Sequence, residues 1–189
     1  MAEFLKRCNW PSDDKLMINY HDEEWGVPLH DDDKLFEFIV LDGFQAGLSW
    51  KTILHKREKF RLAFDNFDAK IISTYSEEKV AELMNNSGII RNKLKIRATI
   101  SNATAFLEIQ KEFGSFNKYI WQFTNHKTID NKLNSLKKMP VTSTESDAMS
   151  KDLKKRGFKF VGSTICYAFM QAAGMVNDHT VDCFRYKRL

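Results

Sequence analysis

The sequence predicts an all-α fold, and three observations lead to that prediction. No run of alternating apolar and polar residues is long enough to form a strand of a sheet. Only three prolines and eight glycines occur in 189 residues, so long helices would be little interrupted. Several stretches repeat apolar residues every three or four positions behind a residue type that caps helices. The length suits one domain, and we predict a single domain over residues 1–189.

The composition is typical of a protein folded in water, because 43% of the residues are hydrophobic and 29% are charged. The net charge of +4 permits an anionic partner such as nucleic acid without requiring one. No apolar run approaches the length of a bilayer span, and residues 1–7 are too short and too charged for a signal peptide. We therefore expect a cytoplasmic protein with no membrane partner.

The first two predicted helices differ in character. A helix over 13–25 would be capped by Ser12 or Asp13. The next helix would begin at 31–33, three aspartates whose negative charge suits the positive end of a helix. This second helix is apolar on nearly every side, which predicts a central position, and it would deliver Asp42 at its C-terminal end.

The middle of the chain adds further helices and many basic residues. Ser49 would cap a helix over 50–64, and we expect most of the cations on its basic side to be solvated. A long helix is predicted over 91–113, and cations crowd its first turns, where a helix disfavours positive charge. That crowding indicates the negative charge of a partner. Residues 125–141 are polar and are predicted to form a surface excursion.

Two helices joined by a glycine-bounded loop are predicted at about 147–174, which is the pattern of a helix–hairpin–helix motif. Gly157 and Gly162 allow the loop backbone to approach a partner closely, and Ser163 would begin the second helix with free N–H groups that favour anions. Lys159 belongs to a cluster of cations around the loop. A DNA phosphate fits this pattern better than a free metabolite does. The alternative is an ordinary tight pair of helices.

Four residues of metal-binding type lie in one pair near each end of the chain, Cys8 with His21 and His179 with Cys183. The last two are four positions apart, which would place them on one face of a helix. Two thiolates and two imidazoles form a closed tetrahedral set, so the predicted cofactor is a structural Zn²⁺ that joins the termini. The third cysteine, Cys166, lies in an apolar stretch and is predicted to be core. An odd, sparse set of cysteines argues against a disulfide framework.

Residues 41–50 place one carboxylate, Asp42, in a stretch that also contains two glycines, an amide and two aromatic rings. A carboxylate is costly to bury in such a stretch unless it has a partner. The simpler interpretation is that Asp42 caps a helix or lies at the surface. The alternative is that Asp42 lies in the wall of an aromatic pocket and accepts hydrogen bonds from a ligand.

Six stretches of the chain together form a specific set. They are residues 7–10, 20–28, 45–50, 88–93, 153–162 and 177–179. This set resembles the 3-methyladenine DNA glycosylase I family, bacterial base-excision repair enzymes of the helix–hairpin–helix superfamily. The resemblance covers nearly the whole chain. It implies an all-helical glycosylase domain, a zinc held by the four residues named above, double-stranded alkylated DNA as the partner and free 3-methyladenine as the product. It also implies a bacterial cytoplasmic protein that associates with the nucleoid through DNA, and we expect a monomer.

The resemblance further implies a pocket for a flipped 3-methyladenine. The predicted base-binding residues are Trp10, Tyr20, Trp25, Phe44 and Trp50. The family most often has Glu at position 42 and Gln at position 44, whereas this chain has Asp42 and Phe44. We predict that Asp42 is the catalytic carboxylate and accepts a hydrogen bond from the exocyclic amine of the base. Leu48 is predicted to contact DNA as the wedge that fills the vacated stack, and the alternative is a core position.

Methylation at N3 gives adenine a positive charge, which makes the base a good leaving group and a cation that aromatic rings attract. We therefore predict an enzyme that mainly flips and recognises the base. Asp178 and Asp182 neighbour the metal ligands and are predicted to orient them. One alternative is a catalytically impaired DNA-binding relative with altered base specificity. Another is a zinc-stabilised helical protein whose pocket binds a small cationic ligand.

Overall fold

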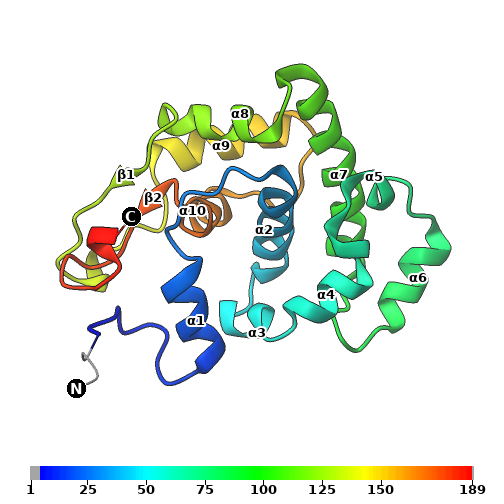
Figure 1. Ribbon diagram of the computed structural model, residues 1–189. Helices are drawn as coiled ribbons and strands as arrows, with labels where there is room; N and C mark the ends of the chain where they lie inside the picture. Colours follow the sequence, from blue (N-terminus) through cyan, green and yellow to red (C-terminus); the bar gives the residue numbers. More distant parts are fainter. Residues whose placement is uncertain (1–4, 189) are drawn as a thin grey trace.

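The computed structural model describes residues 5–188, which form a mostly helical protein around one hydrophobic core (Figure 1). Its α-helices are α1 (Lys15–Glu23), α2 (Asp32–Gln45), α3 (Trp50–Leu54), α4 (Arg57–Ala63), α5 (Ala69–Ile72), α6 (Glu77–Asn85), α7 (Lys93–Phe113), α8 (Phe116–Trp121), α9 (Thr144–Lys155) and α10 (Ser163–Ala172). None of the helices in the described range combines the length with the apolar character that a membrane span requires. The prediction about residues 1–7 concerns in part residues 1–4, which lie outside the described chain.

Helix α2 runs through the middle of the molecule, as its apolar sequence predicted (Figure 1). Asp31 caps it, because its carboxylate accepts a hydrogen bond from the backbone N–H of Lys34. Every residue from Leu35 to Phe44 is buried, since α3, α7, α8 and α10 pack around the helix. The helix continues to Gln45, so Asp42 lies inside its last turn rather than beyond its end.

Two helix starts near α2 test the predicted caps. Asp14 caps α1, one residue after the predicted position, by accepting from the backbone N–H groups of the first turn. Ser49 caps α3 as predicted. The single helix predicted over 50–64 is wrong, because the chain bends at His55 and forms the two helices α3 and α4. The apolar spacing continues across the bend, so the sequence pattern does not reveal it.

A small parallel strand pair adds to the predicted all-α fold. Strand β1 (Ile129–Asp130) pairs with β2 (Val176–Asn177), which follows α10. Each strand has only two residues, too few to produce an alternating pattern. The pairing draws residues 125–141 against the C-terminal segment, and Leu133 in this stretch is buried. The other residues of this stretch are exposed or half-buried, so the predicted surface excursion is confirmed for most of it and fails at Leu133.

Helices α9 and α10 pack against each other and are joined by the loop 156–162. Ser143 caps α9 in a reciprocal capping box with Ser146, which fixes where the helix begins. Helix α10 is apolar, buries Cys166 as predicted and also packs against α2. This arrangement places one face of α10 beside the last turn of α2.

Candidate functional site

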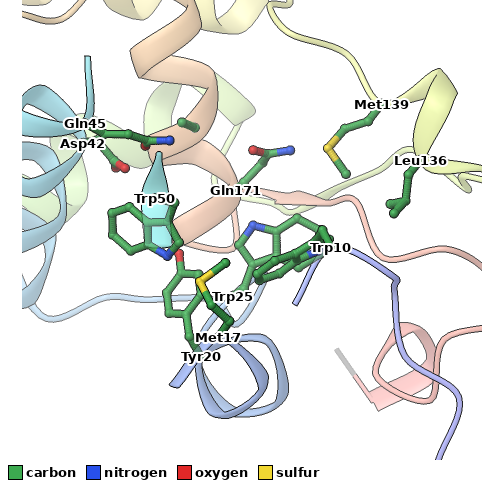
Figure 2. A pocket seen from close by; sticks show the side chains of 11 residues that line it. Trp10, Met17, Tyr20, Trp25, Asp42, Gln45, Trp50, Leu136, Met139 and Gln171 are labelled. Atoms are coloured by element: carbon green, nitrogen blue, oxygen red, sulfur yellow. The ribbon is translucent and has the colours of Figure 1, made fainter. Parts of the chain in front are cut away.

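A pocket of about 260 Å³ opens where α1, α2, α3 and α10 meet the segment after β1 (Figure 2). Its wall is mostly apolar, with a few polar groups. The lining residues are Trp10, Met17, Tyr20, Trp25, Asp42, Gln45, Trp50, Leu136, Met139, Ala168 and Gln171. The pocket therefore has the mixture of aromatic walls and isolated polar atoms that is typical of small-molecule sites.

Four aromatic side chains form one side of this pocket, as the sequence predicted. The ring of Trp10 lies edge-on to Trp25, with centroids 5.1 Å apart, and 6.2 Å from Tyr20. The ring centroids of Tyr20 and Trp50, which also line the pocket, lie 5.1 Å apart. Helix α1 supplies Tyr20, the residues on either side of that helix supply Trp10 and Trp25, and the start of α3 supplies Trp50, so the fold adds a distant ring to a local aromatic cluster.

Asp42 projects from the last turn of α2 into the pocket (Figure 2). The residue is only 2% exposed, and its Oδ2 atom has no hydrogen-bond partner among residues 5–188. Burial raises the pKa of Asp42 well above its usual value, and the positive charge of Arg57 opposes this shift. Asp42 thus lies in the wall of an aromatic pocket with an oxygen free for a ligand, and the simpler interpretation of a cap or surface residue is wrong.

Two indole N–H donors of the pocket wall are also unpaired in the part of the chain that the structure describes. The indole Nε1–H groups of Trp10 and Trp50 are buried and have no acceptor within the described chain. Buried polar atoms normally find a partner, so unpaired donors and an unpaired acceptor around one pocket indicate a polar ligand with both kinds of group.

Phe44 does not line the pocket, and its predicted role as a base-binding residue is wrong. Its ring is 1% exposed and packs in the core, with its centroid 4.8 Å from that of Phe60 and 5.8 Å from that of Phe64. On a helix, residues three apart share a face, whereas residues two apart point in nearly opposite directions. Gln45 therefore joins Asp42 in the pocket, and Phe44 faces the core.

Leu48 lies in the turn between α2 and α3 and is 41% exposed, so the core alternative is wrong. The neighbouring Gly47 has a φ of +80°, a conformation that glycine adopts without strain.

Buried Lys95 holds the end of α2, because its Nζ donates to the carbonyl oxygens of Phe44 at 2.8 Å and Ala46 at 2.6 Å. Lys95 is therefore satisfied internally, and the predicted role of facing a partner's negative charge is wrong for this one cation of the first turns of α7.

One cation on the basic side predicted for residues 50–64, where most cations were expected to be solvated, is buried. Arg57 of α4 is 7% exposed, and its guanidinium donates to Glu37 and to Glu24. These bonds hold a permanent positive charge close enough to Asp42 to affect the pKa of that carboxyl group.

Two glycines and the hydrogen bonds of one amide side chain determine the conformation of the loop between α9 and α10. Gly157 has a φ of +100°, and Gly162 precedes α10, which no side chain caps within residues 5–188. Asn102 of α7 donates to the carbonyl of Lys159 at 3.1 Å and accepts from its N–H at 2.8 Å. The Lys159 side chain is exposed, whereas the hydroxyl of Ser163 donates to Asp147. Only the backbone of Ser163 is therefore free for an anion.

Three of the four predicted metal ligands converge in the buried interior between the two ends of the chain. The ligand atoms of Cys8, His21 and Cys183 lie within 4.8 Å of one another, and Cys183 Sγ lies 3.5 Å from His21 Nε2. The ring of His179 lies 4.9 Å from that of His21, and its Nε2 is buried without a partner among residues 5–188. Residues 179–183 form a turn rather than the predicted helix.

The hydrogen bonds around this cluster orient both imidazoles. His21 Nδ1 lies 2.7 Å from Asp22, and His179 Nδ1 lies 3.2 Å from Asn177 Oδ1. With Nδ1–H donating in each case, Nε2 keeps its lone pair for the interior of the cluster. Asp178 and Asp182 do not orient these rings, contrary to prediction. The first binds Gln171 and the second binds Lys6.

Several pocket residues were missed by sequence reasoning. Met17 and Ala168 resembled ordinary core positions on helices, and Gln171 resembled a polar residue on an exposed helix face. The only signal for Gln171 is its position on an otherwise apolar helix. Leu136 and Met139 reach the pocket because the β1–β2 pairing brings in a distant segment, which no local pattern indicates.

Comparisons with known proteins found a matching family, similar sequences and similar structures. A family model described as methyladenine glycosylase matches residues 10–186. DNA-3-methyladenine glycosylase 1 of Escherichia coli (strain K12) is 50% identical over 182 residues, which cover 96% of this chain and 97% of that protein. A crystal structure of a 3-methyladenine DNA glycosylase I superposes with a TM-score of 0.93 at 52% identity, covering 95% of this chain and 98% of the other. A variant of such an enzyme in complex with 3-methyladenine has a TM-score of 0.92 at 33% identity, covering 94% and 96%.

Proposed function

Because the chain belongs to the methyladenine glycosylase family, we propose that it is a base-excision repair enzyme that hydrolyses the N-glycosidic bond of 3-methyladenine in alkylated double-stranded DNA. The released base is free 3-methyladenine. The observation that carries the proposal is the carboxylate of Asp42, which lies in an aromatic pocket and whose Oδ2 has no hydrogen-bond partner in the described part of the chain. We further propose that the protein acts as a monomer in the bacterial cytoplasm.

Recognition of the base rests on charge. Adenine methylated at N3 is a cation, and a cation held against aromatic faces in a desolvated site gains about 2 kcal/mol. The rings of Trp10, Tyr20, Trp25 and Trp50 supply such a wall, and Asp42 supplies a nearby negative charge and an acceptor for the exocyclic amine. An ordinary adenine lacks the charge and gains less from the same pocket.

Bond cleavage then needs little acid assistance. The glycosidic electron pair leaves with the base and neutralises its positive charge, while the sugar carbon becomes electron-deficient and bonds to the oxygen of a water molecule, which releases a proton to the solvent. The anionic side chain of Asp42 stabilises positive charge on both the base and the sugar as the bond stretches. A buried position makes this interaction stronger than it would be in water, because few solvent dipoles screen it.

We propose that the loop 156–162 and the start of α10 bind the DNA backbone as a helix–hairpin–helix motif. Support comes from Gly157 and Gly162, from the uncapped N–H groups that begin with Ser163 and from the exposed cation of Lys159. Leu48 projects from a neighbouring turn beside the pocket and is proposed as the wedge that fills the stack after the base leaves it.

We also propose that Cys8, His21, His179 and Cys183 hold a structural zinc. Two thiols and two imidazoles are the donor set that zinc prefers, and the buried Nε2 of His179 has no partner within the described chain. When bound, the metal would supply a cross-link between the two ends of the protein. It would leave no open position for substrate, so no step of the reaction depends on it.

The function is tested by incubating the protein with methylated duplex DNA and separating the released bases by chromatography. We expect release of 3-methyladenine in proportion to time and protein, and no release of unmodified adenine. DNA binding without base release would instead support a catalytically impaired relative. A protein that neither binds DNA nor releases base would support the small-ligand alternative.

Replacing Leu48 by alanine is expected to lower kcat/KM on a fully paired duplex by about tenfold. Without the leucine side chain, nothing fills the gap that the flipped base leaves in the stack. The effect should shrink when the lesion is opposite a mismatch, where the base is already loosely stacked. Thermal stability should hardly change, since Leu48 is largely exposed. Leu62→Ala, which removes an 81% exposed leucine on α4, is the matched control and should leave activity unchanged.

Reversing the charge of Lys159 is expected to weaken DNA binding several-fold and to reduce the slope of log K against log salt by about one. Lys187→Glu makes the same change at an exposed lysine near the C-terminus and serves as the control. The measurement is a salt titration of affinity for an unmodified duplex. Equal affinity and slope for Lys159→Glu and wild type would remove the loop from the DNA-binding surface.

A further inference from the structure

Asp178 is a buried carboxylate that the proposed mechanism does not use. It is 1% exposed and does not line the pocket. Its Oδ2 accepts hydrogen bonds from Gln171 Nε2 at 2.7 Å and from the Tyr167 hydroxyl at 2.9 Å, and its Oδ1 accepts from Asn131 Nδ2 at 2.6 Å. With three donors directed at it, Asp178 has little capacity left to contact a substrate.

The bond to Asp178 determines which end of the Gln171 amide faces the pocket. An ionised carboxylate only accepts hydrogen bonds, so Gln171 must turn its NH₂ group to Asp178 and its carbonyl oxygen away. Gln171 lines the pocket, and Figure 2 shows its oxygen on the side of Asp42 and Gln45, with its nitrogen on the opposite side. The pocket thereby gains a second acceptor besides Asp42.

The surrounding structure holds this arrangement in place. Gln171 and Tyr167 lie one turn apart on α10, so both reach Asp178 from one helix face. Burial and the neighbouring carboxylate raise the pKa of Tyr167, which keeps its hydroxyl protonated as a donor. Asn131 follows β1, and its backbone N–H donates to Asn177 O in the paired strand at 3.3 Å.

We propose that Asp178 is a positioning residue that acts through Gln171 to make the pocket select adenine over guanine. Adenine presents the N6 amine, a donor, where guanine presents O6, an acceptor. Two acceptors, Asp42 and the Gln171 carbonyl, favour the amine and repel the guanine oxygen. This inference rests on the proposed excision of N3-methylated bases and adds the source of base selectivity.

The test measures release of 3-methyladenine and 3-methylguanine from one methylated duplex under single-turnover conditions. In Asp178→Asn the new amide can donate to the Gln171 carbonyl, so Gln171 is free to turn its NH₂ group into the pocket. We expect the rate for 3-methyladenine to fall about tenfold or more and the ratio of guanine to adenine release to rise about tenfold. Tyr167→Phe removes another donor to Asp178 while leaving the bond to Gln171, and should keep the wild-type ratio.

If Asp178→Asn does not fold, Gln171→Met tests the same inference. Methionine fills similar space without an acceptor, so the preference for adenine should weaken while the melting temperature stays near that of wild type. A wild-type ratio in both folded variants, or in Gln171→Met alone if the other variant is unfolded, would overturn the inference while leaving the excision activity intact. A wild-type protein that releases no base would overturn the proposed function, and this inference with it.

Discussion

Asp42→Asn is expected to lower single-turnover release of 3-methyladenine by about 100-fold or more while raising the melting temperature. The rate falls because asparagine has the size of aspartate without the negative charge that stabilises the cationic base and the developing charge on the sugar. Stability rises because the substitution removes a buried carboxylate whose Oδ2 has no hydrogen-bond partner within the described chain. Opposite signs for activity and stability are expected where a strained group serves function.

The pH dependence of this stability difference follows from the raised pKa of Asp42. The folded state holds the Asp42 proton at pH values where the unfolded chain has already released it. Folding stability from this group is therefore greatest below the ordinary pKa of aspartate and decreases as pH rises toward the folded pKa. The gain in melting temperature of Asp42→Asn should accordingly grow as pH rises over that window.

For activity, an Asp42→Asn variant that retains the wild-type rate of base release would remove Asp42 from the mechanism.

Cys183→Ser is expected to cost stability rather than chemistry. Loss of a structural zinc removes several kcal/mol of binding free energy, which for a chain of this length should lower the melting temperature by roughly 10 °C or more. The protein that remains folded at low temperature should release base at nearly the wild-type rate, because the cluster lies outside the pocket lining. The measurements are zinc per chain by elemental analysis, melting temperature with and without chelator, and release rate.

Cys166→Ser provides the matched control for the zinc proposal. Cys166 is also a buried cysteine, but it lies on α10, and its Sγ is 3.5 Å from the carbonyl of Val161, which a serine hydroxyl can also reach. This variant should keep one zinc per chain. A Cys183→Ser protein that retains as much zinc as wild type and melts at the same temperature would contradict the proposed site.

The helices were largely predictable because the signals for them are local. The three aspartates at the start of α2, the cap at Ser49 and the apolar run through the core are signals that each span only a few residues. The bend that separates α3 from α4 and the pairing of β1 with β2 were not predictable, because both depend on contacts between distant segments.

The candidate site, like the fold, was predicted in part from the sequence. The four aromatic residues and Asp42 were predicted through a resemblance that covers several motifs, and the fold brings them together. Phe44 was assigned to the pocket because it is aromatic and close in sequence, yet helical geometry turns it into the core. Its departure from the usual family residue therefore lies outside the pocket lining. Gln171 was missed because a pocket-facing amide looks the same in sequence as a solvated one.

The most direct test of the central claim is the pH dependence of kcat/KM for release of 3-methyladenine, corrected for spontaneous loss of the base. If ionised Asp42 grips the cationic base, kcat/KM should rise with pH through the raised pKa of this carboxyl group, well above the range of an ordinary aspartate. Asp42→Asn should give a low and flat profile. A flat wild-type profile over the same range, with DNA affinity unchanged, would show that the charge of Asp42 does not drive excision.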